Sequence, residues 1–256
     1  MHSLTIPQGL LLTGAAFFAG AVDAVAGGGG LITVPSLLAV GLPPHVALGT
    51  NKGQALFGSF AAGIRYAHAG LVDRRSARVT FPMGFVGSLA GAALVLVIRP
   101  EVLRPIVLLL LIAAAVVVTI VRPTPRNGAN RFKRHAGPIA ALIALVIGAY
   151  DGFFGPGTGT FLIAAFVGLL GMSMTRASAD AKVVNFASNV AAAAVFAHRG
   201  VVIWAIAIPM AVAQLLGGFL GAHIAVRRGV RFVRGVVLLV VLALAIKIGH
   251  DLYLGR

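Results

Sequence analysis

The segment Asp23-Ala-Val-Ala-Gly27-Gly28-Gly29-Gly30-Leu31-Ile32-Thr33-Val34-Pro35 interrupts an apolar run with a carboxylate, four consecutive glycines and a proline. Glycine and proline both interrupt helices. In lipid, an interrupted backbone leaves N–H and C=O groups without partners, which costs several kcal/mol for each group. We therefore expect this segment to be covered by protein or to line a water-filled cavity.

A second interrupted segment follows about half a chain later, at Asp151-Gly152-Phe153-Phe154-Gly155-Pro156-Gly157-Thr158-Gly159-Thr160. Two broken apolar segments at corresponding places in two halves indicate the binding site of a transporter. Other landmarks recur in the same order, which indicates an internal duplication: Lys52 with Lys182, Tyr66-Ala-His68-Ala-Gly70 with Phe196-Ala-His198-Arg-Gly200, and Gly87-x-x-x-Gly91 with Gly217-x-x-x-Gly221. The paired glycines let helices approach closely in lipid.

The composition places the chain in a membrane. It is 59% hydrophobic and 11% charged, whereas a soluble domain has roughly 25% charged residues. Its mean hydropathy is +0.99. Several charge-free runs match the ~20 apolar residues that a span needs, including 3–22, 79–98, 105–121 and 200–222. We expect an all-α polytopic membrane protein, in which 4–26 is a retained helix and not a signal peptide.

The net charge of +15 does not indicate nucleic-acid binding, because the basic residues cluster in short connectors. Such clusters are typical of cytoplasmic loops, which also contact anionic lipid. Placing them in the cytoplasm gives each half an odd number of crossings, so we expect inverted repeats. The first repeat is 1–122, the basic cytoplasmic linker is 123–137, and the second repeat is 138–256. The clustered residues are Arg74, Arg75 and Arg78; Arg122, Arg126, Arg131, Lys133 and Arg134; and Arg227, Arg228, Arg231 and Arg234.

Four charged residues lie within or beside apolar segments: Asp23, Lys52, Asp151 and Lys182. Ions inside a membrane are costly and usually face a cavity or a partner. In one interpretation the lysines line an anion site between the halves, where breaks at Gly28, Gly29, Gly30 and Gly157 expose backbone N–H groups. In the other, Asp–Lys pairs only tie helices together. We place both lysines near the start of their helices, where the helix dipole would add to their charge.

Polar neighbours accompany both lysines. Asn51 and Gln54 flank Lys52, and Asn185 and Asn189 follow Lys182 by three and seven residues, on one helical face. Such amides can donate to an oxyanion, or they can form hydrogen bonds between helices. Thr158 can likewise donate to a ligand or cap a helix. Asp23 and Asp151 are the candidates for coupling transport to protons.

Other kinds of site are not indicated by the sequence. The chain has no cysteine, no metal-ligand spacing and no readable Ser/His/Asp arrangement. The four glycines of the first break lack the Gly-Lys-Ser/Thr ending of a nucleotide-binding loop. We therefore expect no catalytic residues, no metal, no cofactor and no nucleic-acid partner.

The two broken segments also resemble those of a known family. The run from Asp23 to Pro35, with Gly41-Leu42-Pro43, Ala47 and Gly49-Thr50-Asn51-Lys52, resembles the first signature of the TauE/SafE family. This is the sulfite exporter, or toluene sulfonate uptake permease, family. The second half, Tyr150-Asp-Gly-Phe-Phe-Gly-Pro-Gly-Thr-Gly159 followed by Lys182 and Asn185, is similar to its second signature.

The resemblance implies a multi-pass transporter of the bacterial inner membrane, with two homologous halves. It implies about eight spanning helices and some short or re-entrant segments. It also implies small sulfur-containing anions as substrates, such as sulfite, sulfoacetate or other organosulfonates.

We therefore expect a secondary transporter, acting as an exporter of such anions by alternating access, and not an enzyme. A passive anion channel and a membrane scaffold without transport are the alternatives. The expected partners are the anion and membrane lipid, and a homodimer is a further assembly to consider.

Overall fold

The computed structural model describes residues 5–120 and 136–228, and this part of the chain forms helices and no strands. In chain order they are α1 (Ile6–Ala26), α2 (Gly30–Ala39), α3 (Pro44–His68), α4 (Arg74–Val97), α5 (Pro100–Ile120), α6 (Ala136–Phe153), α7 (Thr158–Leu170), α8 (Met174–His198) and α9 (Trp204–Arg228). The predicted linker 123–137 lies outside the described residues, apart from residues 136 and 137 in α6, and so does the end of the predicted second repeat, 229–256.

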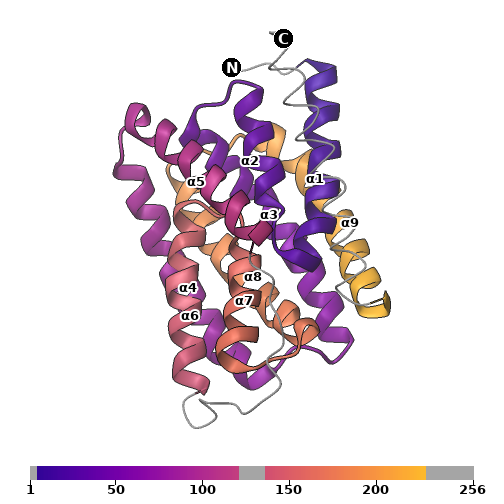
Figure 1. Cartoon of the computed structure of the whole chain (residues 1–256). Helices are drawn as coiled ribbons and strands as arrows, with labels where there is room; N and C mark the ends of the chain where they lie inside the picture. The colour runs from indigo at the N-terminus through magenta and orange to yellow at the C-terminus, as the bar shows by residue number, and fades with distance from the viewer. Residues whose placement is uncertain (1–4, 121–135, 229–256) are drawn as a thin grey trace.

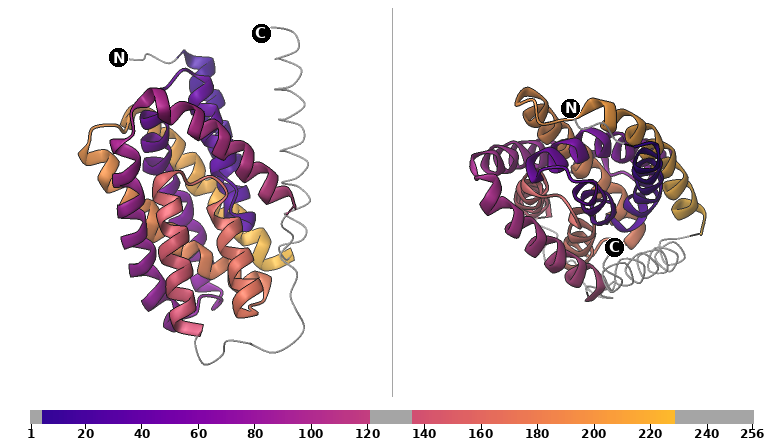
Figure 2. Two further views of the ribbon diagram at one scale, coloured as in Figure 1. Left: turned by 60° about the vertical axis from the view of Figure 1, so that its left-hand side comes forward. Right: turned by 90° about the horizontal axis from the view of Figure 1, so that it is seen from above.

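The helices form one bundle, and most of the long ones run along its long direction (Figure 1). A second view shows the same arrangement, with α5 crossing the bundle obliquely (Figure 2). Two helices are short: α2 has 10 residues and α7 has 13. At 1.5 Å per residue they are about 15 and 20 Å long, against about 30 Å for the hydrocarbon core of a bilayer. Each therefore ends inside the bundle, α2 in its upper part and α7 in its lower part in Figure 1.

The long helices pack mainly across the two halves of the chain. α1 packs on α9, α4 packs on α6, and α3 packs on both α8 and α9. Glycine makes these contacts close, because a Cβ on Gly87 would lie 2.1 Å from Leu145 O, and one on Gly217 would lie 2.0 Å from Phe17 O. Backbones can meet in this way only where side chains are absent. The same contact recurs one turn later, at Gly91 against Ala149 and at Gly221 against Ala21.

The outer surface of the bundle is apolar. Among the described helices, five are long and apolar enough to cross a membrane by length and composition, namely α1, α4, α5, α6 and α9. Large exposed side chains on them include Leu10, Phe18, Leu109, Ile112 and Leu216. The all-α, multi-pass membrane class that the sequence predicts is therefore confirmed. The count of about eight spans and the inverted relation of the halves stay predictions.

Candidate functional site

Two ion pairs join the two halves of the chain inside the bundle. Lys52 Nζ on α3 lies 2.7 Å from Asp151 Oδ1 on α6. Lys182 Nζ on α8 lies 2.8 Å from Asp23 Oδ2 on α1. The side chains of Lys52, Asp151 and Lys182 are 2%, 4% and 0% exposed, and that of Asp23 is 14% exposed. Because a charge inside a membrane needs a partner, each lysine is neutralised by the aspartate of the other half.

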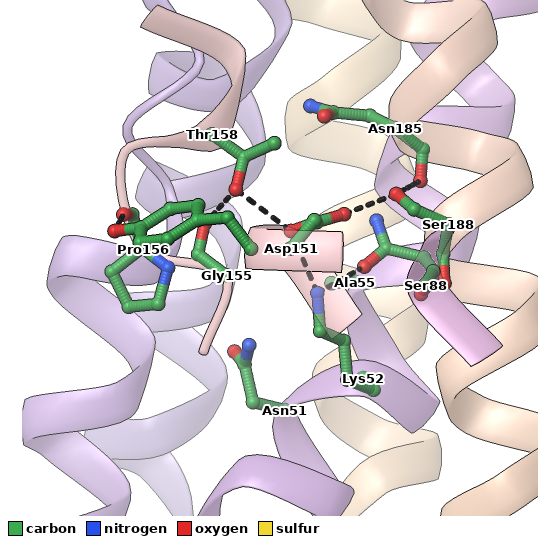
Figure 3. A network of polar contacts seen from close by, with 12 residues as sticks. Asn51, Lys52, Ala55, Ser88, Asp151, Gly155, Pro156, Thr158, Asn185 and Ser188 are labelled. Carbon is green, nitrogen blue, oxygen red and sulfur yellow. Dashed lines mark hydrogen bonds and ion pairs between the residues drawn. The ribbon is translucent and has the colours of Figure 1, made fainter. Parts of the chain in front are cut away.

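The Lys52–Asp151 pair lies in a network of polar side chains (Figure 3). Thr158 Oγ1 lies 2.9 Å from Asp151 Oδ1, and Ser188 Oγ donates to Asp151 Oδ2. Lys52 Nζ also donates to Asn189 Oδ1 at 3.1 Å. Asp151 thus accepts hydrogen bonds from an ammonium group and from the Ser188 hydroxyl. It shares the Thr158 hydroxyl with Gly155 O, which lies 2.6 Å from Thr158 Oγ1.

A second set of hydrogen bonds involves Asn51, the residue before Lys52. Asn51 Oδ1 accepts from Thr33 Oγ1 of α2 at 2.5 Å and from Gln54 Nε2 at 3.0 Å. Gln54 Oε1 is buried and has no hydrogen-bond partner among the described residues. These bonds connect the short helix α2 to α3, at the level of the first break.

The two chain breaks touch each other. The backbone at Gly27, which ends α1, has φ +76°, and that at Gly157, which precedes α7, has φ +86°. Only glycine adopts such angles readily. Gly159 N–H donates to Gly27 O at 3.1 Å, and Thr160 Oγ1 donates to Ala26 O at 2.5 Å. The breaks are therefore covered by protein and by each other, as the sequence predicts for an interrupted segment in lipid.

The glycines predicted to face an anion also have packing roles. A Cβ on Gly29 would lie 2.6 Å from Ala19 O, and a Cβ on Gly30 would lie 3.0 Å from Pro156 Cα. Gly28 has only ordinary contacts, with its nearest neighbour 3.8 Å from such a Cβ. Close packing therefore explains Gly29 and Gly30 without a ligand, and contact of these residues with an anion stays a prediction.

The structure divides the predicted residues among this network, the Lys182–Asp23 pair and the hydrogen bonds of Asn51 and Gln54. Lys52, Asp151, Thr158 and Asn189 share one network. Asn189 contacts the lysine of the other half, although it lies two turns after Lys182 on its own helix. Asn185 Oδ1 is buried and has no hydrogen-bond partner among the described residues. Asn185 thus has unused hydrogen-bonding capacity beside the network in Figure 3.

The predicted contribution of the helix dipole to the lysines is wrong. α3 begins at Pro44 and α8 at Met174, so Lys52 and Lys182 each lie more than two turns inside a helix. The field of a helix terminus falls off within the first turn. The N-termini of α3 and α8 therefore add nothing at the lysines, and the helix that begins at this network is α7, at Thr158.

Sequence reasoning missed three buried polar residues of this region. Ser188 donates to Asp151, Thr33 donates to Asn51, and Asp180 accepts from the Asp73 backbone N–H at 3.0 Å. Asp180 could have been found as a further carboxylate in an apolar segment, two residues before Lys182. Ser188 lies between Asn185 and Asn189, but a single serine in such a helix does not by itself indicate a contact with a site residue.

A groove of about 660 Å³ lies away from the ion pairs, between α2, the turn that follows it, and α5. Its lining is mostly apolar, with Glu101 and Arg104 at the start of α5 as its charged members. None of the predicted site residues lines it. The buried polar region therefore offers a ligand the groups of the ion pairs and the amide side chains. Their N–H groups can donate hydrogen bonds to an oxyanion.

Comparisons with known proteins agree with this picture. A family model described as Sulfite exporter TauE/SafE matches residues 12–248. The probable membrane transporter protein ORF9 of Sinorhizobium sp. is 39% identical over 93% of this chain and 90% of its own length. The probable membrane transporter protein YfcA of Escherichia coli K12 is 38% identical, over 94% of this chain and 91% of its own.

A probable membrane transporter protein of Haemophilus influenzae is 35% identical, over 92% of both chains. No solved structure shows a significant match. The family match covers most of the chain, and it includes both breaks and both ion pairs. The chain therefore belongs to the TauE/SafE family of membrane transporters.

Proposed function

We propose that this protein is a secondary transporter that exports small sulfur-containing anions, such as sulfite, sulfoacetate or other organosulfonates. It acts by alternating access across the bacterial inner membrane, as a transporter and not as an enzyme. The observation that supports this proposal is the burial of Lys52 and Lys182 between the halves of a membrane protein, beside two chain breaks. Buried ions in a membrane mark substrate or ion pathways.

In this proposal the anion binds between α2–α3 and α7–α8. The two lysines supply positive charge, and the amides of Asn51, Gln54, Asn185 and Asn189 supply donors. Gly28, Gly29, Gly30, Gly157 and Thr158 line the same place and supply backbone and hydroxyl donors. Gln54 and Asn185 each have a buried amide oxygen without a partner in the described chain, which supports their availability to rearrange around a ligand.

Alternating access follows from the arrangement of the halves. We propose that residues 1–122 and 138–256 are inverted repeats joined by the basic linker 123–137. The matching contacts of Gly87 and Gly217 support this relation, and so do the opposite positions of α2 and α7 in Figure 1. In such transporters the repeats rock around a fixed midplane site.

The test is flux of labelled sulfur anions into proteoliposomes, comparing wild type with Lys52→Ala and Lys182→Ala. Arg75→Ala is the matched control, because it removes a positive charge from an exposed position at the start of α4. We expect saturable flux of at least one anion, lost in both folded lysine variants and kept in Arg75→Ala. Flux that does not saturate would identify a passive channel, and absence of flux for every anion would contradict the proposal. Size measurement of the purified protein reports whether it forms a homodimer.

A further inference from the structure

The two ion pairs occupy corresponding positions but have different surroundings. Asp151 has two hydroxyl neighbours, Thr158, which follows it by seven residues, and Ser188, which follows Lys182 by six. The corresponding positions in the first half are Gly30, seven residues after Asp23, and Gly58, six residues after Lys52. Asp23 therefore lacks both hydroxyl donors.

Asp23 is the more weakly held carboxylate of the two. Lys182 Nζ is its side-chain hydrogen-bond partner in the described chain, and its side chain is 14% exposed against 4% for Asp151. Fewer hydrogen bonds hold its carboxylate in place, and its side chain is the more exposed of the two. Of the two aspartates, Asp23 can more readily leave its lysine.

The Gln214 side chain fills the space beside Gly58, the position at which the second half has Ser188. A Cβ on Gly58 would lie 2.5 Å from Gln214 Cγ and 3.0 Å from Gln214 Nε2. A Cβ on Gly20 would lie 3.0 Å from the same Cγ, and Gly20 precedes Asp23 by less than one turn on α1. Gln214 is 2% exposed, and its Oε1 has no hydrogen-bond partner among the described residues. This oxygen is an acceptor that a protonated carboxyl group on the same face of α1 can use.

The elements packed around Asp23 carry several charged or titratable groups. α2 and α7 contain none. Tyr66 on α3 donates to the Ala24 carbonyl at 3.0 Å, and His223 on α9 accepts from Arg65 on α3. On α8, Lys182 pairs with Asp23, and Asp180 accepts from the Asp73 backbone N–H. Lys52 on α3 pairs with Asp151.

We propose that the Lys182–Asp23 pair opens during transport, whereas the Lys52–Asp151 pair stays closed. This inference rests on the proposed function. The anion replaces Asp23 on Lys182: the Nζ–H hydrogen bond to Asp23 Oδ2 breaks, and one to an anion oxygen forms. Asp23 takes up one proton from water, and its new O–H donates to Gln214 Oε1. One anion and one proton enter together, so the buried charge is unchanged.

Thermodynamic linkage makes this proposal measurable. If one proton is taken up with each anion, the Kd for the anion increases about tenfold for each pH unit over the range in which Asp23 is ionised in the free protein and protonated in the anion complex. The anion used as the probe must not change its own charge over the pH range of the experiment. Methanesulfonate is suitable, because its sulfonate group stays ionised across the range of the experiment.

The experiment is calorimetric titration of the purified full-length protein with methanesulfonate at about pH 6, 7 and 8, where linkage predicts a tenfold step per unit. We expect this slope in wild type. Asp23→Asn, which resembles the protonated state, should bind with a pH-independent Kd. Ser188→Ala is the control for a change beside the other aspartate. It removes a hydroxyl that contacts Asp151 and the Asn185 carbonyl, leaves the Lys182–Asp23 pair intact, and should keep the wild-type slope.

A second variant covers the case in which Asp23→Asn does not fold. Gly58→Ser combined with Gln214→Ala supplies the missing hydroxyl and removes the side chain that fills its place. It should hold Asp23 in the ionised pair and weaken binding about tenfold or more at each pH.

A slope kept in folded Asp23→Asn, or tight binding kept in the double variant, would overturn the inference. A wild-type Kd that does not change with pH would overturn it while leaving the proposed function standing. Absence of binding at every pH would contradict the proposed function and this inference together.

Discussion

The α1–α9 and α4–α6 interfaces are alike, whereas the surroundings of the two ion pairs are not. In each interface a glycine Cβ would lie about as close to a carbonyl oxygen, 2.0 Å at Gly217 and 2.1 Å at Gly87. Around the ion pairs, Thr158 and Ser188 of one half correspond to Gly30 and Gly58 of the other. The two halves thus share the positions that set helix packing and differ in those that supply hydrogen bonds. Because the packing positions are shared, the polar residues around each ion pair can differ between the halves without changing how the helices pack.

The largest expected effect is the loss of Asp151. Asp151→Ala leaves Lys52 buried without its partner carboxylate, so we expect a loss of about 3–5 kcal/mol in the free energy of unfolding. Asp23→Ala should cost less, because Asp23 has one donor where Asp151 has three. Denaturant unfolding of the purified variants in detergent measures both.

A double variant is the control for this comparison. Lys52→Ala combined with Asp151→Ala removes both charges and should be more stable than Asp151→Ala alone, because no unpaired ion remains. Equal losses for Asp151→Ala and Asp23→Ala would show that the hydroxyl groups around Asp151 do not matter for stability.

Glycine substitutions at the interfaces should have the next largest effect, and an equal one in the two halves. Gly87→Ala and Gly217→Ala each place a methyl group against a backbone carbonyl, so we expect each to cost about 1–3 kcal/mol. Gly63→Ala is the control, since a Cβ there has no neighbour within 4 Å. Its stability should match or slightly exceed wild type. A large difference between Gly87→Ala and Gly217→Ala would contradict the likeness of the interfaces.

The smallest expected effect is the loss of one hydroxyl beside Asp151. Ser188→Ala should cost about 1 kcal/mol, because one hydrogen bond to a buried carboxylate is lost. Ser36→Ala is the matched control, since the Ser36 hydroxyl donates only to Ile32 O in its own helix at 2.7 Å. Thermal unfolding of the two variants side by side measures the difference. If Ser36→Ala lost as much stability as Ser188→Ala, the hydrogen bond to Asp151 would have no special role in stability.

The helix ends at the two breaks could be predicted from the sequence, because their signal is local. Gly27 and Gly157 have positive φ angles that favour glycine, and both lie within the segments identified as broken. The starts of α3 and α8 also had local signals, Pro44 at the first helical position and Ser173 before Met174. Helix starts taken from these two signals put each lysine more than two turns inside its helix, as the structure has them.

The partners of the site residues could not be predicted in the same way. A sequence with two lysines and two aspartates does not say which pairs form, since that depends on which helices pack together. Ser188 and Ser36 look alike in the sequence. The Ser188 hydroxyl donates to Asp151, whereas the Ser36 hydroxyl donates to a backbone carbonyl of its own helix. Local patterns therefore identified the charged residues, whereas their partners depend on how α3 lies against α6 and α8, and on how α8 lies against α1.

The pairing of distant segments has a consequence for biosynthesis. Asp23 and Lys182 are separated by 159 residues, and Lys52 and Asp151 by 99. At about 5–20 residues per second, a ribosome needs roughly 8–32 s to make Lys182 after it has made Asp23. During that interval α1 has neither its ionic partner nor α9, the helix whose glycines pack against it. The insertion machinery must shelter the carboxylate of a half-made chain from lipid until the second half arrives.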